Sequence, residues 1–287
     1  SMQAIHDATG AIAINSGEVF LCCGVESMTF IPMNGLTYDP HPKLSKDNPN
    51  VYMSMGITAE NVAKKFDISR KEQQDFAISS HSKANLARES NLFDNEIVSI
   101  TNNDEKINKD GGIRPNTSHE ILDGLKLAFD ENGTVTAGTA SPLTDGASAV
   151  IVCEEEYAKK NNLNILARIK STAVVGCPPE LMGLGPINAS KKALKRANLS
   201  ISDIDIVELN EAFASQSLAC IKELKMDINK VNVHGGAIAL GHPLGATGAR
   251  ITGKVATLLH NNNKKYGLAT QCIGLGQGIA TVLENIN

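Results

Sequence analysis

Three side chains able to take part in catalysis occur in succession in the C-terminal half of the sequence. Asn210 follows a short apolar run, His242 lies within the glycine-rich stretch GGAIALGHPLGATGAR, and Cys272 opens a second one, CIGLGQG. Glycine permits positive φ angles and lets a backbone approach a ligand closely, and the unshielded N–H groups after Cys272 could bind an anion. A thiol beside an imidazole would suit nucleophilic catalysis, as in a thiol hydrolase.

The spacing of these residues indicates a common location. Asn210 and His242 are 32 residues apart, and His242 and Cys272 are 30 apart, close to the ~30 residues of one βα unit. Successive units return the chain to the same edge of a sheet, where open α/β folds bind ligands. Simpler interpretations stay open: a histidine in a surface loop, an asparagine at a helix N-cap and a buried, inert cysteine.

The elements that must position these groups follow from periodicity and turn signals. A helix and a buried strand come first, and then a polar insertion whose second helix follows a Ser69 to Glu72 capping box. A strand running into a helix comes next, and after it strands and helices alternate, with a strand at VNVHGG and a helix from Arg250. Such alternation predicts a layered α/β fold. The four zones cover residues 1–32, 33–133, 134–160 and 161–287.

The composition is typical of a globular protein, with 42% hydrophobic and 20% charged residues. A net charge of −4 without a basic run argues against nucleic-acid binding. No apolar stretch approaches the ~18 residues of a membrane span, and no secretion signal is visible, so we expect a cytoplasmic protein. The six cysteines lack CxxC pairs, which predicts neither a disulfide framework nor a metal site. Cys22, Cys23 and Cys153 lie in apolar runs and should be buried.

Several motifs together resemble those of the thiolases. They are CCGVESM (22–28), MGITAENVAKKFDISR (55–70), GTVTAGTASPLTDGASAV (133–150), NEAFA (210–214) and the two glycine-rich stretches. Their order is that of the family, and the similarity extends over essentially the whole chain. It is strongest to the bacterial 3-ketoacyl-CoA thiolases, the β subunit of the fatty-acid oxidation complex. The resemblance implies a five-layered αβαβα fold of two similar α/β halves, with an incomplete N-terminal half and residues 33–133 as an inserted loop domain.

The resemblance also implies roles for individual residues. Cys272 would be the catalytic acid and base, with its thiol pKa shifted toward neutrality by glycine-loop amides and a nearby imidazole. His242, with a water held by Asn210, would donate to the thioester oxygen, and the N–H of Gly274 would form half of a second oxyanion hole. The glycines around His242 would clear space for the CoA thioester. Contacts to CoA and the acyl group would come from Ser141, Met55, Phe129 and Phe213, although plain core packing would explain the three apolar residues as well.

One element of the family pattern is absent from this sequence. The cysteine that thiolases acylate stands in a C-x-S-S-M-Q-A stretch, and this sequence opens at SMQA. We therefore expect the equivalent position to precede Ser1, and we expect the chain alone to be inactive in acyl transfer, because covalent catalysis needs its nucleophile.

The activity implied is that of an acyl-CoA C-acyltransferase, which cleaves 3-ketoacyl-CoA with CoA in fatty-acid β-oxidation. CoA and acyl-CoA are then substrates, and no cofactor is required. Expected partners are a second copy in a homodimer or tetramer, and the hydratase/dehydrogenase α subunit of an oxidation complex. Two alternatives remain at this point: a biosynthetic acetoacetyl-CoA thiolase, and a non-catalytic acyl-CoA-binding or oligomeric subunit.

Overall fold

The computed structural model describes residues 1–33 and 35–286. Helices and strands alternate along most of the chain, and a polar region with four α-helices lies between the first and second long strands. The elements are α1 (Met2–Ala13), β1 (Val19–Ser27), α2 (Pro42–Asp47), α3 (Met55–Phe66), α4 (Arg70–Glu89), β2 (Ile100–Asn102), β3 (Glu105–Ile107), α5 (His119–Asp123), β4 (Asp145–Cys153), α6 (Glu155–Lys160), β5 (Arg168–Gly176), α7 (Gly185–Ala197), β6 (Ile206–Leu209), α8 (Ala214–Leu224), α9 (Ala237–Leu240), α10 (Leu244–Asn261), β7 (Tyr266–Ile273) and β8 (Gln277–Glu284).

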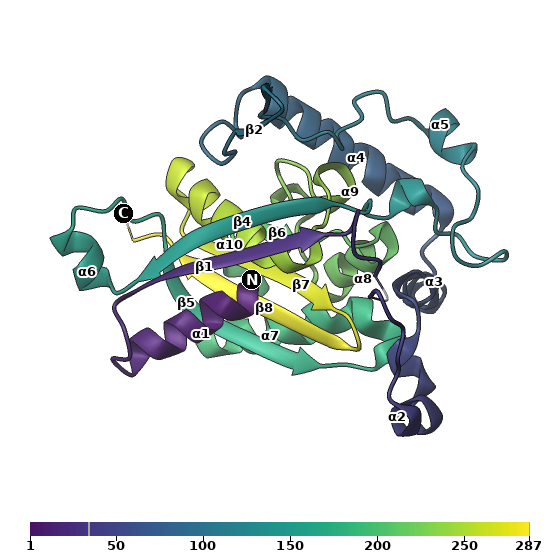
Figure 1. Ribbon diagram of the computed structural model, residues 1–287, viewed down its shortest axis with the longest axis horizontal. Helices are drawn as coiled ribbons and strands as arrows, with labels where there is room; N and C mark the ends of the chain where they lie inside the picture. The colour runs from purple at the N-terminus through teal and green to yellow at the C-terminus, as the bar shows by residue number, and fades with distance from the viewer. Residues whose placement is uncertain (34, 287) are drawn as a thin grey trace.

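Two sheets carry the architecture. The larger has the order β5-β8-β7-β6, with β6 and β7 parallel and β8 antiparallel to both of its neighbours. The smaller is the antiparallel pair β1-β4. A short β2-β3 hairpin lies apart from both. Because β6 and β7 run in parallel, their carboxyl ends meet at one edge of the larger sheet (Figure 1).

The helices α1 and α10 form a layer between the two sheets, and α7 and α8 cover the other face of the larger sheet (Figure 1). Ile251, Val255 and Leu259 of α10 are at most 1% exposed, and burying each such side chain stabilises the fold by about 1.5–3 kcal/mol. The described residues thus supply four successive layers, helix, sheet, helix and sheet, of the expected αβαβα arrangement.

The insertion lies at one end of the molecule. Helices α2 to α5 gather at the end opposite α6 and the C-terminus, and the carboxyl end of β7 points toward them (Figure 1). The predicted capping box is confirmed, since the Ser69 hydroxyl accepts from the Glu72 N–H and the Glu72 carboxylate accepts from the Ser69 N–H at 2.7 Å. The insertion therefore places α3 beside the edge of the sheet where Asn210 and Cys272 were expected.

Two element predictions are wrong. The helix placed at Arg250 begins at Leu244, directly after Pro243, so the last glycines of the motif lie in its first turns. The strand predicted at VNVHGG is a single parallel bridge between Val231 and Val207. Beyond this bridge, a side chain takes the place of backbone pairing with β6. The Asn232 side-chain amide accepts from the Leu209 N–H at 2.9 Å and donates to the Leu209 carbonyl at 2.8 Å.

The outer face of the β1-β4 pair is apolar and exposed. Leu21 opposes Ile151, and these side chains are 67% and 64% exposed. Cys23 lies on the same face and is exposed, so the prediction that it is buried is wrong. Strand alternation explains the error, since adjacent Cys22 points to the other face and packs under α1.

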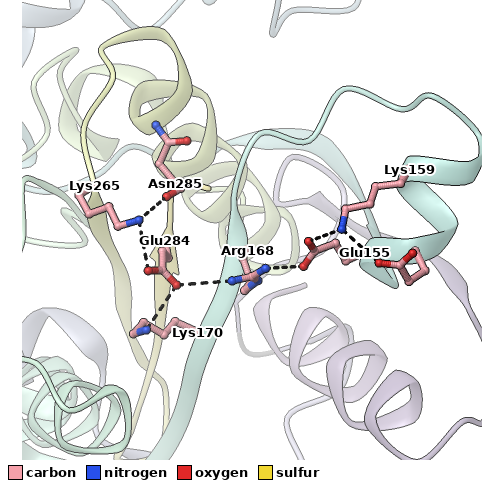
Figure 2. A network of polar contacts seen from close by, with 8 residues as sticks. Glu155, Lys159, Arg168, Lys170, Lys265, Glu284 and Asn285 are labelled. Carbon is pink, nitrogen blue, oxygen red and sulfur yellow. Dashed lines mark hydrogen bonds and ion pairs between the residues drawn. The ribbon is translucent and has the colours of Figure 1, made fainter. Parts of the chain in front are cut away.

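A network of ion pairs joins the larger sheet to α6 (Figure 2). Arg168 of β5 contacts Glu155 of α6 and lies 3.9 Å from Glu284 of β8. Glu284 also accepts from Lys170 at 3.3 Å and pairs with Lys265 at 3.4 Å. Burial alone would raise the pKa of Glu284, but the hydrogen bonds and charges of these lysines outweigh it and hold the pKa below its ordinary value.

Glu284→Gln should therefore lower the free energy of unfolding by about 1 kcal/mol, a shift of about 2 °C in Tm. Glu284 contributes this stability above the ordinary glutamate pKa, and the contribution is lost as the pH falls through its lowered value. Thermal melts of both proteins should hence differ at pH 7 and converge in acid. Glu156→Gln is the matched control, since that side chain is 76% exposed; an equal loss of stability in the control would contradict the prediction.

Candidate active site

Asn210 and Cys272 lie at the same edge of the larger sheet. Leu209 of β6 is in register with Thr270 of β7, and the Asn210 N–H donates to the Thr270 carbonyl at 3.0 Å. Cys272 is therefore only two residues further along the neighbouring parallel strand. The spacing argument is confirmed for this pair.

The Asn210 side chain is buried without a partner. It is 1% exposed, and neither its Oδ1 nor its Nδ2 has a hydrogen bond among the described residues. It is not a helix N-cap, because α8 begins only at Ala214. An unpaired buried amide costs about 1–3 kcal/mol, and a water or a ligand that hydrogen-bonded to it would remove this cost.

Cys272 is enclosed by apolar side chains. Its thiol is 7% exposed. Burial raises its pKa to about 12, which corrects the expectation of a pKa shifted toward neutrality. The reason is that desolvation penalises the thiolate, and His242, which should have favoured it, is itself uncharged. The cluster around the thiol consists of Met55, Ala59, Val135, Ala140, Met182, Ala212 and Phe213.

His242 is held from both sides by threonines. Its backbone N–H donates to Thr144 Oγ1 at 3.2 Å, and its ring Nδ1 lies 2.7 Å from Thr247 Oγ1. The imidazole is 9% exposed. Burial, aided by the charge of Arg250, lowers its pKa to about 4. His242 is thus neutral at pH 7 and carries one ring proton.

The position of that proton depends on the Thr247 hydroxyl. Its oxygen lies 3.0 Å from the Pro243 carbonyl and 2.7 Å from His242 Nδ1, and its single hydrogen can be donated to only one of them. Donation to the Pro243 carbonyl leaves Nδ1 as the ring N–H that the hydroxyl oxygen accepts. Donation to Nδ1 places the ring N–H on Nε2, which has no hydrogen-bond partner among the described residues. The sequence did not point to Thr144 or Thr247 as partners of His242. For Thr247 the available signal was its hydroxyl in the first turn of the helix that follows the histidine.

The residues expected to contact CoA and the acyl group lie together around Cys272. The rings of Phe129 and Phe213 meet edge to face with centroids 5.9 Å apart. Met55 belongs to the Cys272 cluster, and a Cβ on Gly274 would lie 3.1 Å from its Cε. Phe129 is 41% exposed, so it both packs and faces solvent. The backbone N–H of Gly274 has no hydrogen bond among the described residues.

A short segment connects the two sides of the site. Ala140 packs in the Cys272 cluster and pairs with Phe213, and the Ser141 N–H donates to the Ala212 carbonyl at 3.0 Å. Thr144 holds His242. The chain from Ala140 to Thr144 spans at most about 14 Å. Ser141 therefore lies on the segment that links the Cys272 cluster to the threonine that binds the backbone of His242.

The glycines around His242 have a role other than the one expected. A Cβ on Gly235 would lie 2.6 Å from the Ser80 carbonyl of α4, and one on Gly248 would lie 2.2 Å from the backbone nitrogen of Met2. Gly235 also has a φ of +77°. These glycines let distant segments of the protein approach, so the interpretation that they clear space for a thioester is wrong for them.

Comparisons with known proteins show which family the chain belongs to. The family model described as "Thiolase, N-terminal domain" matches residues 1–156, and the model described as "Thiolase, C-terminal domain" matches residues 163–285. The chain belongs to the thiolase family. Its fold is accordingly the thiolase fold, and the family makes it an acyl-CoA C-acyltransferase with CoA thioesters as substrates.

Individual thiolases are similar over the whole chain. The 3-ketoacyl-CoA thiolase of Photobacterium profundum is 51% identical over 296 residues, which cover 100% of this chain and 76% of that protein. The one of Shewanella loihica is 51% identical over 293 residues, covering 99% and 76%. The crystal structure of human mitochondrial 3-ketoacyl-CoA thiolase in complex with CoA is 41% identical, with a TM-score of 0.91 over 99% of this chain and 75% of that one. The dimeric peroxisomal thiolase of Saccharomyces cerevisiae is 42% identical, with a TM-score of 0.92 over 99% and 73%.

The described part of this thiolase contains neither a cluster of metal-binding side chains nor a membrane-spanning helix. No group of three or more His, Cys, Asp or Glu side chains in residues 1–33 and 35–286 is arranged to hold a metal ion. Within the same ranges, no helix has the length and apolar character needed to cross a membrane.

The burial of Cys272 predicts how reaction rates at the thiol depend on pH. A thiol with a pKa of about 12 ionises progressively as the pH rises, so the rate of alkylation by iodoacetamide should increase about tenfold per pH unit between pH 7 and 10 without a plateau. Mass spectrometry of the Cys272 peptide gives this rate. The exposed Cys23 serves as the internal control. A plateau for Cys272 below pH 9 would contradict the predicted burial.

Proposed function

We propose that this thiolase is a 3-ketoacyl-CoA thiolase of fatty-acid β-oxidation, in which Cys272 is the acid and base. The observation that carries the proposal is the unpaired, buried amide of Asn210 beside the buried thiol of Cys272 at one sheet edge. The names of the relatives support the substrate class, since those from Photobacterium profundum and Shewanella loihica are 3-ketoacyl-CoA thiolases.

The proposed chemistry follows from the donors in the site. When the thiolate of an acyl-accepting cysteine adds to C3 of a 3-ketoacyl-CoA, the bond between C2 and C3 breaks, the acyl group remains on that cysteine as a thioester, and the electron pair passes to the thioester enolate of acetyl-CoA. His242 Nε2 and a water on Asn210 stabilise the enolate oxygen, and Cys272 gives its proton to C2, which releases acetyl-CoA. A high thiol pKa suits this step, because the thiol arrives protonated. The CoA thiol then attacks this thioester, which forms the shortened acyl-CoA and releases the acyl-accepting cysteine as a thiolate, and the CoA thiol proton returns to Cys272.

The remaining site residues take supporting roles in this proposal. The free N–H of Gly274 would donate to the carbonyl oxygen of an acyl-cysteine, and Ser141 would contact the pantetheine arm that reaches between His242 and Cys272. Met55, Phe129 and Phe213 would line the apolar path. The zones 1–32, 33–133, 134–160 and 161–287 remain our proposed division, with 33–133 as the loop domain that contributes Met55 and Phe129.

None of the other five cysteines lies in the cluster around Cys272. Cys220 is fully buried in α8 and its pKa is raised by burial, while Cys22 and Cys23 lie on β1. We therefore infer that the 287-residue polypeptide by itself forms no acyl-enzyme but retains the proton-transfer half of the reaction. Dimer formation is supported by the dimeric yeast thiolase. Association with a hydratase/dehydrogenase α subunit is part of the same proposal and can be tested by co-purification with that subunit.

The test separates the two halves of the reaction. In D2O, the polypeptide should exchange the methyl protons of acetyl-CoA for deuterium, seen as a mass increase of acetyl-CoA. Intact-protein mass spectrometry in the same sample should show no acetylated cysteine. Absence of exchange despite CoA binding would overturn the assignment of Cys272, and a stable acetyl group on another cysteine would overturn the inferred loss of acyl transfer.

A further inference from the structure

Glu60 is a buried carboxylate that the proposed chemistry does not use. It lies on α3, five residues after Met55, and is 8% exposed. Its two oxygens accept the Thr134 N–H at 2.8 and 3.0 Å, the Val135 N–H at 2.8 Å and the Thr134 hydroxyl at 3.2 Å. Hydrogen bonds to a charged acceptor are about twice as strong as neutral ones. Glu60 thus binds the backbone of a segment more than seventy residues away.

That segment carries Phe129. The Ala128 N–H donates to the Val135 carbonyl at 3.0 Å, and Leu127 pairs with Thr136, so residues 127–136 fold back on themselves with Phe129 on one arm. Val135, on the other arm, is fully buried in the Cys272 cluster. Glu60 therefore binds the half of the segment that contains Val135 and packs against Cys272. The half paired with it carries Phe129.

Two glycines show how tightly α3 and this segment fit. A Cβ on Gly133 would lie 2.1 Å from Glu60 Oε1, and a Cβ on Gly56 would lie 2.1 Å from the Phe129 ring. The segment is thus in close contact with α3 at the carboxylate and again at the ring. A shift of the backbone at Glu60 would move Phe129 relative to Met55 and Phe213.

We infer that Glu60 is a positioning residue, which sets the separation of Phe129 from Met55 and thereby the width of the path for the pantetheine arm. The inference rests on the proposed function, since it assigns a consequence for CoA binding. It predicts that Glu60 affects affinity and not the proton-transfer step, because none of its contacts reaches Cys272, His242 or Asn210.

Glu60→Gln tests the inference. The new amide group would set an N–H donor against backbone N–H donors, so residues 127–136 should lose their hydrogen bonds to α3. The Kd for CoA should then rise about tenfold, as expected for lost charge-assisted hydrogen bonds. The maximal rate of acetyl-CoA deuterium exchange should change less than about threefold, because binding and chemistry are separate steps. Glu223→Gln makes the same chemical change on the exposed side of α8 and should alter neither quantity.

A double-mutant cycle distinguishes positioning from general destabilisation. If Glu60 acts through Phe129, the Kd of Glu60→Gln/Phe129→Ala should equal that of Phe129→Ala within about twofold. Additive effects, or an unchanged Kd in Glu60→Gln, would overturn the inference. Amide exchange of residues 127–136 gives a readout without CoA: it should accelerate in Glu60→Gln only there. If the unchanged chain fails to bind CoA while this local acceleration is seen, the proposed function fails and the anchoring role stands.

Discussion

Cys272→Ala should slow the exchange of the acetyl-CoA methyl protons by at least about a hundredfold, since a positioned acid–base group contributes about 10²–10⁴ to a rate. The reason lies in the geometry of the site. Cys272 is the thiol at the edge where the Asn210 amide is left unpaired, and its neighbours Met55 and Phe213 are apolar. Mass spectrometry of acetyl-CoA incubated in D2O measures the effect.

The matched control for this variant is Cys23→Ala. Cys23 is exposed on the outer face of β1, so the same change there should leave the exchange rate within about twofold, as for surface substitutions away from a site. The Kd for CoA should be unchanged in both variants. Exchange that survives in Cys272→Ala would assign the base to another group and remove the basis of the proposed function.

His242→Ala should slow the same exchange by about 10²–10³, the usual effect of removing one oxyanion donor. Burial holds the imidazole neutral, with its pKa at about 4, and in our proposal the Thr247 hydroxyl donates to Nδ1, so that Nε2 carries the ring N–H. The loss should appear in the maximal rate and not in the Kd for acetyl-CoA, because the hydrogen bond strengthens as the enolate forms.

Thr247→Val refines this second prediction. The variant keeps the imidazole but removes the partner of Nδ1, so the ring can carry its proton on the wrong nitrogen, and the rate should fall about tenfold, in line with loss of a group that fixes the tautomer and orientation of a histidine. The rate between pH 6 and 8 should remain free of any inflection from His242, which stays neutral there. An equal loss of CoA affinity in His242→Ala would contradict a role confined to the enolate.

Much of this architecture is predictable from the sequence because the signals are local. The strands β7 and β8 and the capping box at Ser69 depend on neighbours a few residues away, and the spacing of Asn210 and Cys272 reflects the ~30-residue length of a βα unit. The strand predicted at VNVHGG was wrong because a side-chain amide, Asn232, substitutes for strand pairing there. The helix start predicted at Arg250 was wrong because Pro243 allows the helix to begin earlier, among glycines.

By itself the sequence determined the membership in the family, the order of the elements and the chemical types of the groups at the site, because these depend on motifs and on short-range periodicity. Only the tertiary structure decided that the Cys272 thiol is protonated, that the Asn210 amide is unpaired and that the glycines near His242 admit α4 and α1. Each of these properties depends on desolvation and close approach by residues such as Val135, Ser80 and Met2, which are distant along the chain. Burial is a property of the assembled layers, and no local pattern encodes it.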